Sequence, residues 1–191
     1  MFKNMKMNTR LLLLLSISVL FLLGAILGGM HQLYNLKENL TTSLLSERAE
    51  FDAVMAIDSA QTSFKTQVQD WKDILIRGGN PEDYEKYLSQ FVEQEKRVQA
   101  YLQTAIPLMR KQGITTNDAE NLISTHEQLG AKYRDALKSY DKQSPQAAQT
   151  VDKLVKGMDR PAALGMTKVS EQIRSHAQQF SQEHITSAES T

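Results

Sequence analysis

Cysteine is absent from the 191-residue chain. Its absence excludes disulfide bonds, thiolate metal sites and cysteine nucleophiles. Prolines number only four and aromatic residues make up 7% of the chain, a composition that favours helices over sheets. Neither sign of charge is in excess, because 22 basic residues balance 22 acidic ones. A chain without net charge has no general attraction for nucleic acid, so we expect no nucleic-acid partner.

A single long uncharged stretch is present, from Leu11 to Met30. It has about the 20 residues that a helix needs to cross a bilayer. We interpret it as an uncleaved membrane anchor. A cleaved secretory signal is the competing interpretation, although the stretch offers a poor small-x-small cleavage site.

Three cations, Lys3, Lys6 and Arg10, precede this stretch. Positive residues tend to stay on the cytoplasmic side of a span. We therefore expect residues 1–10 in the cytoplasm, residues 11–30 as the transmembrane helix and residues 31–191 on the far side. In a Gram-negative bacterium the span would lie in the inner membrane and residues 31–191 would form a periplasmic domain.

Three clusters of turn-forming residues divide the rest of the chain, at residues 78–81, 113–117 and 144–145. In each cluster Asn, Thr or Ser is available to cap a helix N-terminus, and two clusters place proline at the first helical position. The predicted helices cover roughly residues 31–77, 82–112, 117–141 and 145–188. Pro107 and Pro161 are expected to kink or briefly interrupt their helices.

Apolar residues recur at steps of three and four in each predicted helix, which is typical of the seams of a helical bundle. No break separates the first of these helices from the membrane span. We therefore predict an all-α fold, in which an N-terminal transmembrane helix is continuous with an antiparallel up-down four-helix bundle.

Polar residues from all four predicted helices converge in the membrane-distal half of this bundle. A rise of about 1.5 Å per residue puts Lys65 about 50 Å beyond the span, and residues of the other three helices reach a similar height. This convergence predicts a ligand site. The candidate ligand-binding residues are Lys65, Gln69, Trp71, Lys72, Arg77, Tyr133, Asp159 and Arg160.

Structural roles compete with this interpretation. Glu95 either pairs with Lys65 to fix the helix register or contacts a ligand, and Trp71 is either a core residue or a binding platform. His126 lies on an apolar seam, where a hydrogen-bonded core histidine is the simpler interpretation. The four histidines do not cluster, so we expect no metal site and no cofactor.

Two stretches carry a family resemblance: AQTSFKTQVQDWKDILIRGGNPEDYEKYLSQF, residues 60–91, and VDKLVKGMDRPA, residues 151–162. Together they resemble the periplasmic four-helix-bundle sensor region of bacterial methyl-accepting chemotaxis receptors. The similarity is to the branch with FK-QVQEWKN-LLRG in the first helix and G-DR in the fourth. Asp70, Asp73 and Ile76 depart from that pattern.

The resemblance implies a homodimeric signal-transduction module, the sensor half of a chemotaxis receptor. It also implies a small ligand, an anion such as an organic acid or amino acid, bound in the distal half of the bundle. Ligand binding would then shift the fourth helix slightly along its axis. Such a module could instead feed a histidine kinase or a cyclic-dinucleotide enzyme.

A membrane-tethered helical scaffold or adaptor is the alternative from another class. We do not expect an enzyme, since the sequence contains no nucleophile elbow, phosphate loop or zinc motif.

Overall fold

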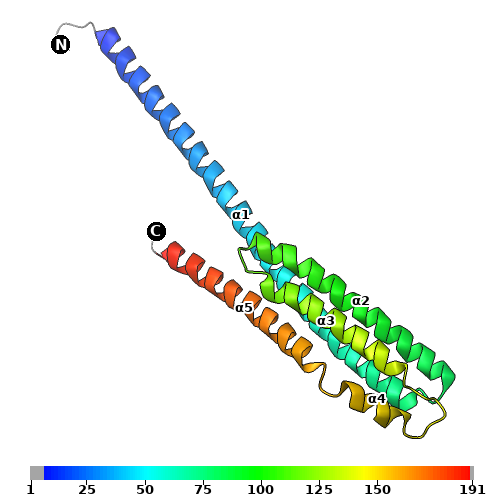
Figure 1. The fold of residues 1–191 in the computed structure, drawn as a ribbon. Helices are drawn as coiled ribbons and strands as arrows, with labels where there is room; N and C mark the ends of the chain where they lie inside the picture. Colours follow the sequence, from blue (N-terminus) through cyan, green and yellow to red (C-terminus); the bar gives the residue numbers. More distant parts are fainter. Residues whose placement is uncertain (1–6, 190–191) are drawn as a thin grey trace. The chain divides into compact units, whose positions relative to one another are not determined.

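The computed structural model describes residues 7–189; residues 1–6 and 190–191, which include part of the expected cytoplasmic N-terminus, lie outside the described residues. The described part is all-helical, with five helices and no strand (Figure 1), so the expected all-α class is confirmed. The helices are α1 (Met7–Arg77), α2 (Pro81–Lys111), α3 (Asn117–Leu137), α4 (Ala147–Val155) and α5 (Arg160–Glu189).

The chain divides into two compact units, Met1–Glu47 and Arg48–Thr191. The described residues of the first unit belong to α1, and large apolar side chains there are exposed. The most apolar window of this helix has a mean hydropathy of 2.8, and the helix is long enough to cross a membrane. Lipid is the environment in which such a surface is stable. The N-terminal part of α1 is therefore a candidate membrane span.

The helices of the second unit begin near the predicted turns. α2 begins at Pro81, and the Asn80 side chain caps it by accepting a hydrogen bond of 2.8 Å from the backbone N–H of Glu82. At the start of α3 the Thr116 hydroxyl donates to the Glu120 carboxylate at 2.8 Å. The Asn80 side chain thus replaces a bond that the first turn of a helix lacks, whereas the expected cap Thr116 makes no side-chain bond to the backbone of α3.

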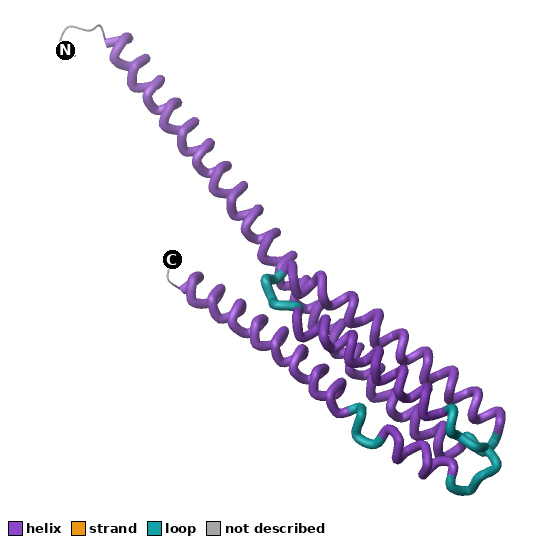
Figure 2. The backbone as a smooth tube through the Cα atoms, in the orientation of Figure 1, coloured by secondary structure: helices purple, strands orange, loops and turns teal. Residues whose placement is uncertain are grey.

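The predicted fourth helix, residues 145–188, is in fact two helices. α4 ends at Val155 and α5 begins at Arg160, with a loop between them (Figure 2). Gly157 has a φ of +75°, a left-handed conformation that costs other residues about 1–2 kcal/mol. Pro161, the second residue of α5, opens this helix without losing a helical hydrogen bond. The break is therefore made by Gly157, whereas Pro107 lies inside an uninterrupted α2.

An aromatic cluster lies in the core of the second unit. The Trp71 ring of α1 stacks on the Tyr133 ring of α3 with centroids 4.3 Å apart, and the Phe91 ring of α2 lies 6.0 Å and 5.6 Å from them. Trp71 and Tyr133 are each only 3% exposed. Such ring pairs contribute about 0.5–1.5 kcal/mol beyond the burial of their area, so the cluster joins three helices.

A buried polar layer joins the same three helices one turn away along α1. His126 of α3 is fully buried, and its Nε2 lies 2.8 Å from Gln67 Oε1 of α1. Its Nδ1 lies 2.7 Å from Gln99 Nε2 of α2. Because an amide nitrogen can only donate, Nδ1 is the acceptor and the ring hydrogen is on Nε2. His126 is thus a hydrogen-bonded core histidine, as expected.

A close approach of α2 and α3 occurs at Gly130. A Cβ added at Gly130 would coincide with the Glu95 carboxylate, which forms an ion pair with Arg134 of α3. The absence of a side chain at Gly130 therefore makes the space for Glu95. The expected alternative of a pair between Glu95 and Lys65 is wrong, since the partner is Arg134.

We predict that this protein loses stability in mild acid through His126. Burial lowers the pKa of His126 from 6.5 to about 4, so the unfolded chain binds more protons between these values and stability falls as pH falls from 6.5 to 4. The shift corresponds to about 3 kcal/mol. Urea unfolding of the full chain in detergent at pH 7 and pH 4.5 should show this loss.

The variant His126→Gln, which cannot titrate at this position, should lose much less stability over the same pH range. His31→Gln is the control, because His31 is exposed and its removal should leave the acid loss unchanged. Equal acid losses in the wild type and in His126→Gln would contradict the prediction.

Candidate functional site

An open groove of about 370 Å³ lies between α1 and α5 in the second unit. We call it the α1–α5 groove. On the α1 side it is lined by Gln61, Phe64, Lys65, Val68 and Lys72. On the other side it is lined by Asp159, Ala163, Met166 and Thr167. Its size falls in the range of pockets that hold small molecules.

The spacing of residues on α1 explains the character of this groove. Lys65 and Lys72 are seven residues apart, so they project from the same side of the helix, about 10 Å from each other. Phe64, just before Lys65, and Val68, between the two lysines, lie on the adjoining core-facing stripe, and Met166 of α5 is fully buried opposite. The groove therefore combines an apolar floor with two ammonium groups at its edge.

The two lysines are available for a ligand. Both side chains are exposed, and neither forms an ion pair with any of the residues that the structure describes. Asp159 contributes a negative charge to the same groove. Chemically, the arrangement can hold an anionic group by its ammonium groups and an apolar portion on its floor. It contains no nucleophile with an adjacent base.

Asp159 also links the groove to the aromatic core. Burial raises the pKa of Tyr133, and the charges of Asp159 and Asp152 add to this increase. The phenol therefore stays protonated to a higher pH than that of an exposed tyrosine. Tyr133 is part of the core and does not line the groove.

The structure places the eight candidate ligand-binding residues in different locations. Lys65, Lys72 and Asp159 come together in the α1–α5 groove, whereas Trp71 and Tyr133 are buried in the aromatic cluster. The remaining three lie outside the groove.

Of these three, Gln69 donates to Asp73 at 3.4 Å, and Arg77 forms an ion pair with the same Asp73 at 3.2 Å. Arg160 is exposed, and its guanidinium folds back over Gly157. Arg160 and Lys72 are both basic and close in predicted height, but only Lys72 lines the groove.

Gln61 and Thr167 line the groove although sequence reasoning did not propose them. Gln61 lies one turn before Lys65 on α1, so helical spacing alone could have identified it. No sequence pattern singled out Thr167, because the face of the bundle to which Thr167 belongs depends on the break at Gly157. The floor residue Met166 had also been assigned no role.

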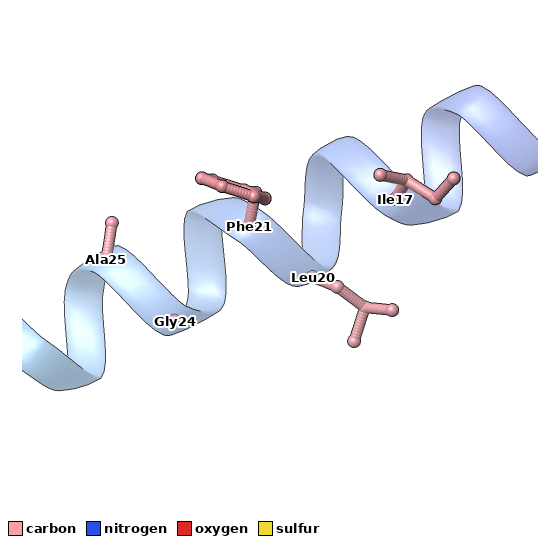
Figure 3. A pocket seen from close by; sticks show the side chains of 5 residues that line it. All are labelled: Ile17, Leu20, Phe21, Gly24 and Ala25. Atoms are coloured by element: carbon pink, nitrogen blue, oxygen red, sulfur yellow. The ribbon is translucent and has the colours of Figure 1, made fainter.

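A second hollow, in the apolar N-terminal segment of α1, has a different character. Figure 3 shows its five lining residues, Ile17, Leu20, Phe21, Gly24 and Ala25, on one stretch of helix. None of them carries a polar side chain. This hollow is part of the apolar surface of the candidate span and offers nothing to orient a polar ligand.

Within the described residues no group of three or more His, Cys, Asp or Glu residues is placed to hold a metal ion. His126, the most deeply buried histidine, uses both ring nitrogens in the polar layer.

The chain is similar in sequence to a known chemotaxis protein. Methyl-accepting chemotaxis protein CtpH of Pseudomonas aeruginosa is 32% identical over 121 residues, which cover 63% of this chain and 21% of that protein. The chain thus spans about a fifth of the length of this relative. No protein-family profile and no solved structure matches the chain significantly. The similarity indicates a role related to chemoreceptors, in line with the resemblance in the sequence.

We predict that Trp71 and Lys72 have separate roles although they are adjacent in sequence. Trp71→Ala should destabilise the protein by about 3–5 kcal/mol, because it removes the largest ring of the aromatic cluster. Lys72→Ala should change stability by less than about 0.5 kcal/mol, because Lys72 is exposed and has no ion pair. Urea unfolding of both variants measures the difference, and a large loss in Lys72→Ala would contradict it.

Proposed function

We propose that this chain is the ligand-sensing part of a membrane-anchored chemoreceptor, and that its ligand is a small anion bound in the α1–α5 groove. The observation that carries the proposal is the pair of lysines, Lys65 and Lys72, which are exposed beside an apolar floor and have no ion-pair partner among the described residues. The similarity to a methyl-accepting chemotaxis protein supports the receptor role. An organic acid or amino acid has the required combination of charge and apolar surface.

The proposed arrangement has residues 1–10 in the cytoplasm, residues 11–30 in the inner membrane and residues 31–191 in the periplasm. The periplasmic part is a four-helix bundle in which α4 and α5 together take the fourth position. Apolar character and preceding cations support the span and its direction. The output that follows ligand binding is that of a chemotaxis receptor.

We further propose that the receptor is a homodimer. Phe51, Met55 and Ile76 are exposed on α1, with Phe51 at 62%. Phe51 and Met55 lie near one end of the part of α1 in the second unit and Ile76 lies near its other end, where a second copy of α1 would cover them.

Binding in the α1–α5 groove would act on the relative position of its two walls. A ligand shifts an equilibrium only by its preference for one of the states. An anion that contacts the lysines of α1 and the Thr167 hydroxyl of α5 at once favours one spacing of these helices. A displacement of α5 is then the signal.

The test is a thermal-shift screen of the full chain in detergent against acetate, succinate, citrate, aspartate and glutamate. An anion present at about 100 times its dissociation constant should add about 2.7 kcal/mol of stability. Lys65→Ala and Lys72→Ala should each remove most of this effect, because each deletes one of the two ammonium groups.

Two variants serve as controls. Arg160→Ala removes a neighbouring cation that does not line the groove, and Lys132→Ala removes an exposed cation of α3. Both should keep the response. If an anion stabilises the two lysine variants as strongly as the wild type, the groove is not its site. If none of these anions has an effect, the proposed ligand class is wrong.

A further inference from the structure

We propose that the turn between α4 and α5 is a mechanical joint, across which α5 moves against α1 at the α1–α5 groove while α4 stays fixed to α3. We call residues 156–159 the α4–α5 joint. The inference rests on the proposed function, since it states which part of the chain responds to the occupancy of the groove.

The backbone of the α4–α5 joint lacks the hydrogen-bond ladder of a helix. Lys156 has an extended ψ of 117° and Gly157 a φ of +75°. Two turn-type bonds hold the segment, from the Met158 N–H to the Val155 carbonyl at 3.0 Å and from the Arg160 N–H to the Gly157 carbonyl at 3.3 Å. A shift of α5 can be absorbed by the torsions of this turn, without breaking the bonds inside α4.

The two helices joined here have different relations to the groove. α4 packs on α3 and buries Val151 and Val155 in the core. No α4 residue lines the groove, whereas Asp159, Ala163 and Thr167 do. The width of the groove therefore depends on the position of α5 and not on that of α4.

The contacts of α5 also differ from those that join α1, α2 and α3. Helices α1, α2 and α3 share the buried polar layer around His126. The hydrogen bonds of this layer form at only one register of the three helices. Two exposed ion pairs tie α5 to its neighbours, Lys168 with Asp118 at 2.7 Å and Arg174 with Asp58 at 2.8 Å.

Exposed pairs of this kind are screened by water and contribute little. Between the joint and Lys168 the buried side chains of α5, Ala162 and Met166, are apolar. Farther along α5, Gln172 donates hydrogen bonds to the Thr115 hydroxyl and backbone carbonyl at 2.7 Å and 3.0 Å. A partly buried contact, His176 Nδ1 to Glu50 Oε1 at 3.1 Å, lies toward the other end of α5. The end of α5 next to the joint is thus the end that can move.

The chain supplies a matched pair of substitutions to test this. Gly157 and Gly113 have nearly equal positive φ values, +75° and +73°. A Cβ at Gly157 would meet only the Arg160 side chain, at 3.6 Å or more, and a Cβ at Gly113 would meet nothing within 4 Å. Alanine therefore strains the backbone at both positions without a clash. Only one of the two positions is in the joint.

The experiment is pulsed electron spin resonance on the full chain in lipid nanodiscs without added ligand. The absence of cysteine allows pairs of spin labels to be introduced directly. One pair joins exposed positions of α3 and α5, Lys132→Cys with Leu164→Cys, and the other joins α3 and α4, Lys132→Cys with Lys153→Cys. The labelled protein is mixed with an excess of unlabelled chain, so that distances between labels in different protomers do not contribute to the signal.

We expect the α3–α5 distance distribution to be broader than the α3–α4 distribution. Gly157→Ala should shift or narrow the α3–α5 distribution alone, and Gly113→Ala should change neither. Both alanine variants should lower the melting temperature by a similar amount, about 2–4 °C.

Equally narrow distributions in the wild type would show α4 and α5 to move as one rod and would overturn the proposal. A Gly157→Ala change that moves both distributions together would overturn it as well. The wild-type comparison decides even if Gly157→Ala fails to fold. Because no ligand is added, this result stands apart from the anion screen, so failure of the joint and failure of the groove as a binding site are distinguishable.

Discussion

The hydrogen bonds of His126 to Gln67 and Gln99 set the register of α1, α2 and α3, and the rest of the second unit follows from that register. A slip of one helix would leave buried polar groups without partners, at about 1–3 kcal/mol each. Gln67 Nε2 and Gln99 Oε1 are buried without partners among the described residues even in the native register. The layer therefore serves specificity of packing more than stability. It places Lys65, two residues before Gln67, at the edge that faces α5.

Much of the fold could be predicted because its signals are local. Asn80 and Pro81 act through the first turn of the helix that follows them, so their effect is visible in the sequence. A kink or a short interruption was expected at Pro161, and the break lies just before it, between Val155 and Arg160. Gly157 is a single glycine among helix-forming residues, and its left-handed φ depends on the packing of Val155 and Ala162 on either side. Pro161 is compatible with a kink, with a short interruption or with the start of a new helix, so it could not fix the place of the break.

The candidate site was harder to predict because height along a helix does not determine the direction of a side chain. Lys65, Lys72 and Asp159 share both a height and a face, and the structure brings them together. Arg77 and Arg160 share the height but not the face. The partner of Glu95 required knowledge of how closely two helices approach, and that distance depends on Gly130, which no periodic pattern singles out.

The contact between Glu95 and Gly130 also limits how this sequence can vary. The space above Gly130 is filled by the carboxylate of a residue 35 positions earlier in the chain. A side chain gained at position 130 is compatible with the same helix spacing only if position 95 becomes shorter, and Arg134 then loses its partner. Natural variants of this chain should therefore change positions 95, 130 and 134 together. Such linked substitutions among related sequences would indicate how closely α2 and α3 approach each other.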